Sequence, residues 1–262
     1  MERAPRKHKA SKSASKDIIS RMPKNVIMHI LDRLPIQYAV RTSILSSNWR
    51  FKWTLLSKVV SDDKFYEYLK RLGRENWYDE LNIAITTSLV FHLVGHFSKL
   101  QELYLDLRMC KFLGELGAEK WVRTSFRCLK TLVLYPIDFS SDIKLSFAFE
   151  MIWGSPELPT LIIVATYNDA IPPPAFCSSA LNHISMGQLK LRIVELKSFG
   201  GSENEIYLIK NLLACSPALK KIVIFADPSQ IFGGENGKLM FATKLLEFHR
   251  ASTAAQVKIY WS

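Results

Sequence analysis

The sequence contains few cysteines, and no two of them are close together. Its four cysteines are Cys110, Cys128, Cys177 and Cys215. A structural zinc site needs closely spaced pairs of ligands, so this spacing argues against bound zinc. Single thiols within apolar segments are typical of buried, reduced cysteines. They favour a reducing compartment, so we expect the protein in the nucleus, the cytoplasm or both.

Long apolar runs are missing as well. No stretch of about 18 apolar residues occurs, so we expect no membrane-spanning helix. The basic N-terminal residues are not followed by an apolar segment, so we predict no secretory signal there. The remaining composition, 48% apolar and 23% charged over 262 residues, is typical of a globular protein with a sizeable core.

The sequence also lacks a convincing catalytic motif. Residues 233–239, GGENGKL, have one residue too few between the glycines of a phosphate-binding loop, and Leu239 stands where that loop needs Ser or Thr. His92 and His96 are four residues apart, but the glutamate of a HExxH zinc motif is absent. No GxSxG nucleophile motif is present. We therefore predict a chain that is not an enzyme and holds no cofactor or metal.

Positive charge is concentrated near the N-terminus. The formal net charge is +11, of which residues 1–16 carry +5 and residues 17–58 carry another +5, so the other 204 residues carry +1. Residues 1–16 have no apolar periodicity, and we predict a disordered basic tail. Such a tail could be a nuclear-import or nucleic-acid patch, or simply a solvated leader.

Residues 22–56 predict three short helices that share an apolar surface. Pro23 suits the start of the first helix, and Pro35 ends it and begins the second. Ser46 or Ser47 can cap the third. About 35 residues cannot bury all of these apolar side chains by themselves, so part of the surface should contact a partner. The helical stripes are Val26, Ile27, Ile30, Leu31 and Leu34, then Ile36, Val40, Ile44 and Leu45, then Trp49, Trp53 and Leu56.

The rest of the chain repeats the frame L-x-x-L-x-L at intervals of 28 to 35 residues. That period is typical of a leucine-rich-repeat solenoid, in which each unit supplies one short strand and a return segment. The alternative, chance recurrence of leucine in an ordinary α/β protein, stays open at this point. Copies begin at Leu100, Leu129, Leu158, Leu191, Leu219 and Ala254.

Alternate strand residues point to opposite faces, so the residues beside the buried frame positions should line the concave face. Together they make a candidate surface for a target protein, although for any single one of them an ordinary solvent-facing strand position is the favoured interpretation. The candidates are Glu102, Tyr104, Asp106, Thr131, Val133, Tyr135, Glu195, Lys197, Lys221, Val223 and Phe225.

The stretch MPKNVIMHILDRLPIQYAVRTSILSSNWRFKWTLL resembles the F-box motif of the plant F-box/leucine-rich-repeat family. The residues LRIVELKSFGGSENEIYLIKNLLACSPALKKIVI resemble the FBD region that follows the repeats in the same family, and LLEFHRASTAAQVKIYW is similar to its closing pattern. Met22, Tyr38 and Asn48 depart from the usual F-box pattern without removing its apolar face. The chain is shorter than usual members of that family, which leaves a truncated repeat array open.

The resemblance implies that the F-box docks on a Skp-family adaptor and, through it, on a cullin-based ubiquitin ligase. The chain would then be the substrate-recognition subunit of an SCF-type ligase, with a separate ubiquitin-charged enzyme supplying the chemistry. The implied adaptor contacts are Met22, Pro23, Ile27, Ile30, Leu31, Leu34, Pro35, Val40, Leu45 and Trp49. Large aromatic residues at helical spacing are more often core than contact, so Trp49 and Trp53 are the members of the stripe best suited to the core.

The expected fold class is α + α/β, with a three-helix F-box followed by an irregular leucine-rich-repeat solenoid that ends in an FBD-like part. The expected divisions are a basic tail (1–16), the F-box (17–60), a helical linker (61–98), repeats (99–185) and the FBD-like region (186–262). Two other functions remain open: an interaction scaffold outside any ligase, and a nucleic-acid-binding protein that uses the basic N-terminus.

Overall fold

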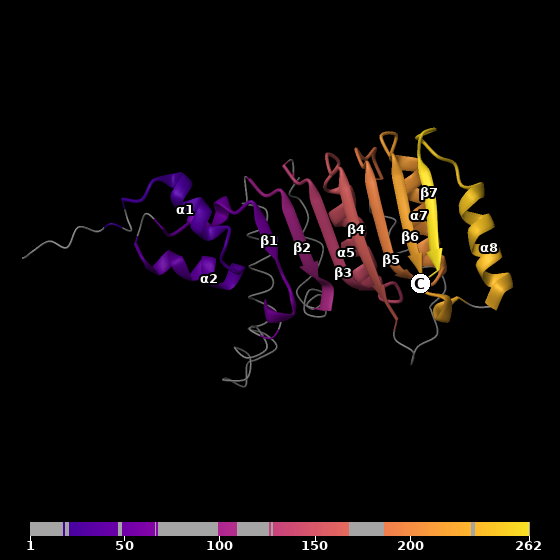
Figure 1. Cartoon of the computed structure of the whole chain (residues 1–262), viewed down its shortest axis with the longest axis horizontal. Helices are drawn as coiled ribbons and strands as arrows, with labels where there is room; N and C mark the ends of the chain where they lie inside the picture. The colour runs from indigo at the N-terminus through magenta and orange to yellow at the C-terminus, as the bar shows by residue number, and fades with distance from the viewer. Residues whose placement is uncertain are drawn as a thin grey trace, which may run out of the picture.

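Small helices at the N-terminal end are joined to a long parallel sheet, as Figure 1 shows. The computed structural model describes residue 18 and residues 21–46, 49–65, 67, 99–108, 126, 128–167, 186–231 and 234–261. The elements in this part of the chain are α1 (Lys24–Leu31), α2 (Ile36–Arg41), the 3₁₀ turns η1 (Thr42–Ile44) and η2 (Lys52–Leu55), β1 (Lys58–Val60), β2 (Glu102–Asp106), β3 (Thr131–Asp138), α5 (Asp142–Trp153), β4 (Thr160–Thr166), β5 (Ile193–Phe199), α7 (Glu203–Cys215), β6 (Lys221–Ala226), η6 (Pro228–Gln230), α8 (Gly234–Glu247) and β7 (Gln256–Trp261).

The described strands form one parallel sheet whose order is the order of the sequence, from β1 to β7. Each new strand is added at the same edge, unlike the doubly wound folds, in which the strand order reverses. Each of the six predicted frames contains one of the strands β2 to β7. The mixed helix and strand composition and the parallel sheet therefore agree with the expected fold class.

One backbone hydrogen-bonding pattern recurs from strand to strand. The carbonyl of the residue just before a strand accepts a hydrogen bond from a backbone N–H at the start of the next unit. The N···O distances are 2.7 to 3.2 Å. Gln101 N–H donates to Ser57, Lys130 N–H to Gln101, Thr160 N–H to Lys130, Arg192 N–H to Pro159, Lys220 N–H to Arg192 and Gln256 N–H to Lys220. A repeated contact at a fixed place in each unit keeps neighbouring strands in the same register.

The register places the frame residues in one buried row. Leu132 pairs with Leu161, and Leu161 pairs with Val194. All three side chains are fully shielded from solvent. The row extends to Leu103 on one side and Ile222 on the other, and the half-buried Val257 packs against its end. Parallel strands need covered apolar surface, and helices α5 and α7 lie behind the sheet and supply it (Figure 1).

Strand β1 was not expected from the sequence. It lies within residues 17–60, where only the F-box was predicted, and it pairs in parallel with β2. Its frame is Leu56, Val59 and Ser61, so the third position is polar although Ser61 is buried. Because of this serine, a search for the leucine frame does not find β1. The backbone hydrogen bond from Gln101 to Ser57 nevertheless follows the pattern of the other strands.

Helices α5 and α7 end in the same way. Each stops next to a Ser-Pro pair, at Ser155 and Ser216, and a strand starts five residues after each serine. At the N-terminus of α7 the Ser202 side chain accepts from the Glu205 backbone N–H while the Glu205 carboxylate accepts from the Ser202 N–H, a capping box. The two helices meet through stacked rings, with Phe149 and Tyr207 centroids 5.9 Å apart.

The turn before α7 requires glycine at two successive positions. Gly201 has φ of +80°, a left-handed conformation that other residues rarely adopt. A Cβ on Gly200 would lie 2.7 Å from the Gln230 Cβ, and one on Gly201 would lie 2.9 Å from the Phe241 ring. Close packing therefore explains the two glycines as much as backbone conformation does.

The N-terminal segment is only partly as expected. Pro23 and Pro35 occupy the N-cap positions of α1 and α2, with extended ψ angles of 145° and 146°. The expected third helix is not an α-helix: the residues described there form the four-residue 3₁₀ turn η2. Trp49 and Trp53 anchor this turn to the core, because both side chains are almost fully buried.

Two of the four cysteines lie in the described part of the chain. Cys215 is half-buried, and burial raises the pKa of its thiol. Cys128 is exposed, so the expectation of buried thiols is wrong for this residue, which lies in a turn before β3 rather than inside an element. Cys110 and Cys177 lie outside the described residues, as do His92, His96 and residues 1–16.

Within the described ranges, no helix has the length and apolar character to span a membrane. The same ranges contain no group of three His, Cys, Asp or Glu side chains that could hold a metal ion. The glycine-rich residues 234–239 form the first turns of α8, where Lys238 pairs with Glu235 at 2.6 Å and lies over the Trp261 ring.

The register can be tested with two neighbouring residues of β4. Leu161 is fully buried and Ile162 is half-exposed on the other face. Leu161→Ala should lower the free energy of unfolding by about 2–5 kcal/mol because it leaves a cavity. Ile162→Ala should cost about 1 kcal/mol or less because less apolar surface is lost. Urea denaturation of both variants measures the difference, and equal losses would contradict this register.

Candidate interaction surfaces

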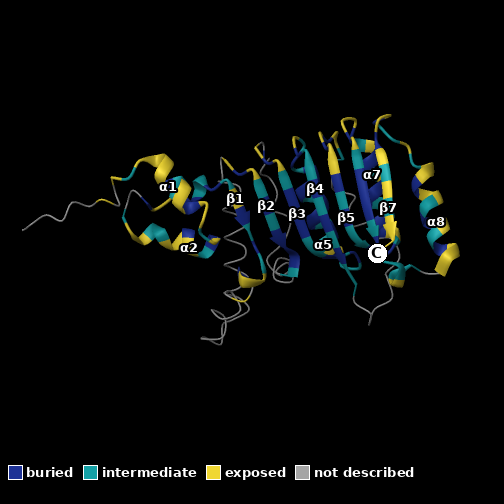
Figure 2. Ribbon diagram, in the orientation of Figure 1, coloured by how far each residue is buried: buried dark blue, intermediate teal, exposed yellow. Residues whose placement is uncertain are grey.

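The predicted adaptor-contact residues separate into an exposed set and a buried set (Figure 2). Ile27, Leu31 and Trp49 are at most 2% exposed and pack in the core with Ile36 and Trp53. A docking partner could not reach them without unfolding the segment. Met22 and Leu34 are half-buried. The exposed members of the predicted set are Pro23, Ile30, Pro35, Val40 and Leu45.

Four further apolar side chains of the same segment are exposed. Ile44 is 86% exposed and Phe51 68%, which is unusual for two large apolar residues in one small unit. Val26 and Tyr38 are exposed as well. Sequence periodicity placed Val26 and Ile44 on the apolar stripes but could not say which edge of each stripe is covered. We call the exposed residues Val26, Ile30, Tyr38, Val40, Ile44, Leu45 and Phe51 the N-terminal apolar surface.

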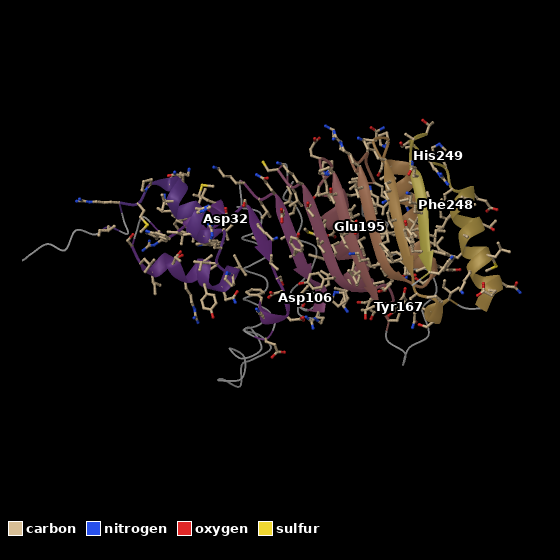
Figure 3. The ribbon with its side chains drawn as sticks, viewed as in Figure 1. Asp32, Asp106, Tyr167, Glu195, Phe248 and His249 are labelled. Atoms are coloured by element: carbon tan, nitrogen blue, oxygen red, sulfur yellow. The ribbon has the colours of Figure 1, made fainter. Side chains whose placement is uncertain are left out.

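The N-terminal helices are fixed to the sheet by a polar contact as well as by the core. The Asp32 carboxylate at the end of α1 accepts from the Ser57 backbone N–H at 3.0 Å and from the Ser57 hydroxyl at 3.1 Å. Ser57 immediately precedes β1. Figure 3 shows Asp32 at this junction. Buried apolar residues form one continuous cluster from Ile27 to Ala255, so helices and sheet share a single core.

The second candidate surface is the open face of the sheet, the face opposite α5 and α7. Figure 1 shows the strands β2 to β7 uncovered by any described helix on that side. The register brings the predicted target-contact residues into cross-strand rows. One row joins Glu102, Thr131 and Lys221, a second joins Tyr104, Val133, Glu195 and Val223, and a third contains Asp106, Tyr135, Lys197 and Phe225.

Other residues complete these rows and were not predicted. Thr160, Ile162 and Val164 of β4 and Ile193 of β5 occupy equivalent positions, and so do Lys258 and Tyr260 of β7. The signal was available, because the same offset from each frame leucine locates them. Val133 and Val223 are buried although they lie on this face, so the middle row is closely packed.

On the open face, the charged side chains Lys58 of β1 and Glu102 of β2 form an ion pair. Lys58 Nζ lies 3.1 Å from Glu102 Oε2 and 4.7 Å from the centre of the Tyr104 ring. The hydrogen bond to Glu102 raises the pKa of Lys58. Both side chains are nearly half exposed, so this pair contributes little to stability but leaves no net charge there.

Asp106 lies where the strands end rather than on an accessible face. Its side chain is fully buried, and it accepts from Arg108 through the backbone N–H at 2.9 Å and through Nε at 2.9 and 3.0 Å. The guanidinium also contacts Asp63. These carboxylates raise the pKa of Arg108, with the hydrogen bond to Asp106 as the largest cause. Figure 3 shows Asp106 at the lower edge of the sheet. Its geometry indicates a structural role.

Tyr135 links this edge to the first strand. Its hydroxyl donates to the Ser61 carbonyl at 2.6 Å. Burial, with a smaller contribution from the nearby carboxylates of Asp106, Asp62 and Asp63, raises the pKa of Tyr135 to about 12. The phenol is therefore held as a neutral donor.

A second buried polar cluster lies at the ends of β4 and β5. Tyr167 donates from its hydroxyl to the Glu205 carboxylate and accepts from the Gly200 N–H. Burial raises the pKa of Tyr167 and that of Glu205. Since Glu205 also caps α7, the cluster fixes the start of this helix against the sheet. Figure 3 places Tyr167 at the same lower edge as Asp106. No described group beside it suggests catalysis.

The N-terminal apolar surface lies within a segment that matches a known domain. The family description for the F-box domain matches residues 19–60. An F-box/FBD/LRR-repeat protein of Arabidopsis thaliana is 52% identical over 50 residues, which is 19% of this chain and 12% of the relative. An FBD-associated F-box protein of Arabidopsis thaliana is 28% identical over 196 residues, 60% of this chain and 41% of the relative. A putative F-box/FBD/LRR-repeat protein of the same plant is 27% identical over 213 residues, 81% of this chain and 43% of the relative.

The chain contains a match to the F-box domain and is similar to plant F-box/FBD/leucine-rich-repeat proteins. The matches span 12% to 43% of the lengths of these three relatives, so the chain corresponds to less than two thirds of each. The matched F-box range contains the whole N-terminal apolar surface and also strand β1. In this chain the F-box match and the first strand of the sheet therefore overlap.

A substitution at Asp106 can test whether this residue stabilises the fold rather than contacts a target protein. Asp106→Asn keeps the side-chain size but removes the charge that Arg108 contacts. It should lower the free energy of unfolding by about 2 kcal/mol, the range for a hydrogen bond to a charged group. Glu195→Gln is the control, because Glu195 is half-exposed and its loss should change stability by about 0.5 kcal/mol or less. Urea denaturation measures both, and a neutral Asp106→Asn would contradict the structural role.

Tyr135 should titrate later than free tyrosine. A difference titration at 295 nm between the wild type and Tyr135→Phe should place its ionisation near pH 12 in the folded protein. The folded state retains this proton while the unfolded state loses it near pH 10. The contribution of Tyr135 to stability is thus fully present below pH 10 and falls as the pH rises toward 12. Ionisation near pH 10 in the folded protein would contradict the buried hydrogen bond.

Proposed function

We propose that this chain is a substrate-recognition subunit of an SCF-type ubiquitin ligase. F-box proteins of this kind generally act as substrate adaptors in such ligases, and the F-box generally binds a Skp-family protein. The observation that carries the proposal is the N-terminal apolar surface, which lies within the matched F-box range and is exposed in the isolated chain. Through the adaptor the chain would join a cullin, in the nucleus or the cytoplasm.

We infer that the sheet is a stack of irregular leucine-rich-repeat units. The sequential strand order, the spacing of the frames and the recurring contact from Ser57 to Gln256 support this inference. In such a stack each unit packs only against its neighbours and presents one row of side chains. The FBD-like part, residues 186–262, would then continue the same stack through β5, β6 and β7.

The adaptor would bind the exposed members of the predicted contact set. Ile30, Val40 and Leu45 remain candidates, and Ile44 and Phe51 join them on exposure. Ile27, Leu31 and Trp49 would support the surface from beneath. A target protein would bind the open face of the sheet. The chain itself would do no chemistry and would raise the rate of ubiquitin transfer by holding the target near the charged enzyme.

Adaptor binding can be tested on exposed residues without disturbing the core. Ile44→Asp/Leu45→Asp places two charges on side chains that are 86% and 50% exposed, so the variant should fold. A charge buried in an apolar contact is costly, so pull-down of a Skp-family adaptor should fall at least tenfold. The measurement is the amount of adaptor retained by the purified full chain.

The control variant carries the same change on another exposed apolar pair. Leu239→Asp/Met240→Asp alters residues of α8 that are 68% and 72% exposed and lie outside the F-box range. It should bind the adaptor as well as the wild type does. Failure of the wild type to bind any of several Skp-family adaptors would overturn the proposal. Undiminished binding by the Ile44/Leu45 variant would place the contact elsewhere.

A further inference from the structure

Charge is distributed unevenly along the open face. On β1 and β2 the charged side chains are paired with each other, as Lys58 is with Glu102. On β5 to β7 this face carries Glu195, Lys197, Lys221 and Lys258. Glu195 lies 3.5 Å from Lys197, which neutralises that pair. In the part of the chain that the structure describes, no carboxylate lies within 4.0 Å of Lys221 or Lys258.

A partly exposed aromatic pair lies beside Lys258, two rows along the strands from Lys221. Phe225 and Tyr260 face each other across β6 and β7, with ring centroids 5.3 Å apart and planes within 19°. Tyr260 is 48% exposed. Lys258 is two residues before Tyr260, so both point to the same face about 7 Å apart. The buried Val223 is paired with Lys258 on the neighbouring strand and lies between Lys221 and Phe225 along β6.

We propose that an extended acidic segment of the target protein binds across β5 to β7. Its Asp or Glu side chains would pair with Lys221 and Lys258, and an apolar side chain beyond the Lys258 contact would lie on the Phe225–Tyr260 pair, which is the next row along the strands. This proposal rests on the proposed function and deepens it, because it names the class of segment that the sheet recognises. Complementary charge makes such a contact specific, and the rings supply apolar contact area.

The same surface does not suit a phosphorylated segment or a nucleic acid. Phosphate is generally recognised by the planar fork of arginine, and strands β5, β6 and β7 contain no arginine. A nucleic-acid backbone needs a continuous row of cations. Here Glu195 and the aliphatic Val223 interrupt the row. Carboxylates spaced along an extended peptide match two separate lysines better.

The test uses the full chain bound to its Skp-family adaptor. A phage-displayed library of random 12-residue peptides is selected on the wild-type complex and depleted on a complex carrying Lys221→Glu/Lys258→Glu. Both lysines lie at the surface and should tolerate the change, which circular dichroism and thermal unfolding verify. The expected result is enrichment of peptides that combine Asp or Glu with an aromatic or aliphatic residue. Enrichment without acidic residues, or no enrichment, overturns the proposal.

The most enriched peptide is then measured by fluorescence anisotropy. Its Kd should weaken at least tenfold in the Lys221/Lys258 variant and at least threefold in Tyr260→Ala, and rising salt should weaken it further. The control Lys210→Glu/Lys244→Glu makes the same charge change on exposed residues of α7 and α8 and should alter the Kd less than twofold. If the control variant weakened peptide binding equally, the change in Kd would be due to net charge alone, and the proposal would be overturned.

Two further measurements separate the possible failures. A single-stranded RNA oligonucleotide that binds the wild type and is lost only in the Lys221/Lys258 variant would assign the surface to nucleic acid instead. Adaptor pull-down is repeated with every variant. If adaptor binding persists while acidic peptides fail, only this inference is overturned. If the wild type binds no adaptor, the proposed ligase function fails by itself.

Discussion

The rest of the structure depends on the buried apolar row that crosses the sheet. Leu103, Leu132, Leu161, Val194 and Ile222 are fully shielded, and each is in register with the next. Burying such side chains supplies most of the favourable free energy of folding. The period-2 geometry of strands then sends the intervening residues to the opposite face. One constraint therefore sets both the core and the composition of the open face.

The same row also positions the N-terminal helices. Val59 continues the row into β1. This strand begins at Lys58, three residues after the turn η2 ends at Leu55. Trp49, Trp53 and Leu56 join the same core, and Asp32 binds the backbone just before β1. No extended linker separates the apolar N-terminal surface from the start of the sheet. A protein held on the sheet would therefore keep a fixed distance and direction from whatever binds the helices.

Polar groups stabilise the ends of the strands rather than the open face. Asp106 lies at the end of β2 with Arg108, Ser61 follows β1 and accepts from Tyr135, and Tyr167 follows β4 and binds Glu205. Backbone groups at strand ends would otherwise lose partners. Their pKa changes follow from burial and pairing. A perturbed pKa is often taken as a sign of a functional site, but here these groups fix loops and helix ends.

The sequence alone determined the period of the chain, the positions of strands β2 to β7 and the proline starts of α1 and α2. These features follow from local chemistry: apolar alternation and fixed proline φ angles. It also revealed the F-box resemblance, which rests on residues close together in the chain. Only the tertiary structure decided that Ile27 and Leu31 are buried while Ile30, on the same stripe, is exposed. Only the tertiary structure showed that Ser61 continues a leucine frame just after β1, that Asp106 is enclosed by Arg108, and that Lys258 lies one row from an aromatic pair. Each of these outcomes depends on contacts between residues far apart in the chain, and local periodicity carries no information about which neighbour covers a given side chain.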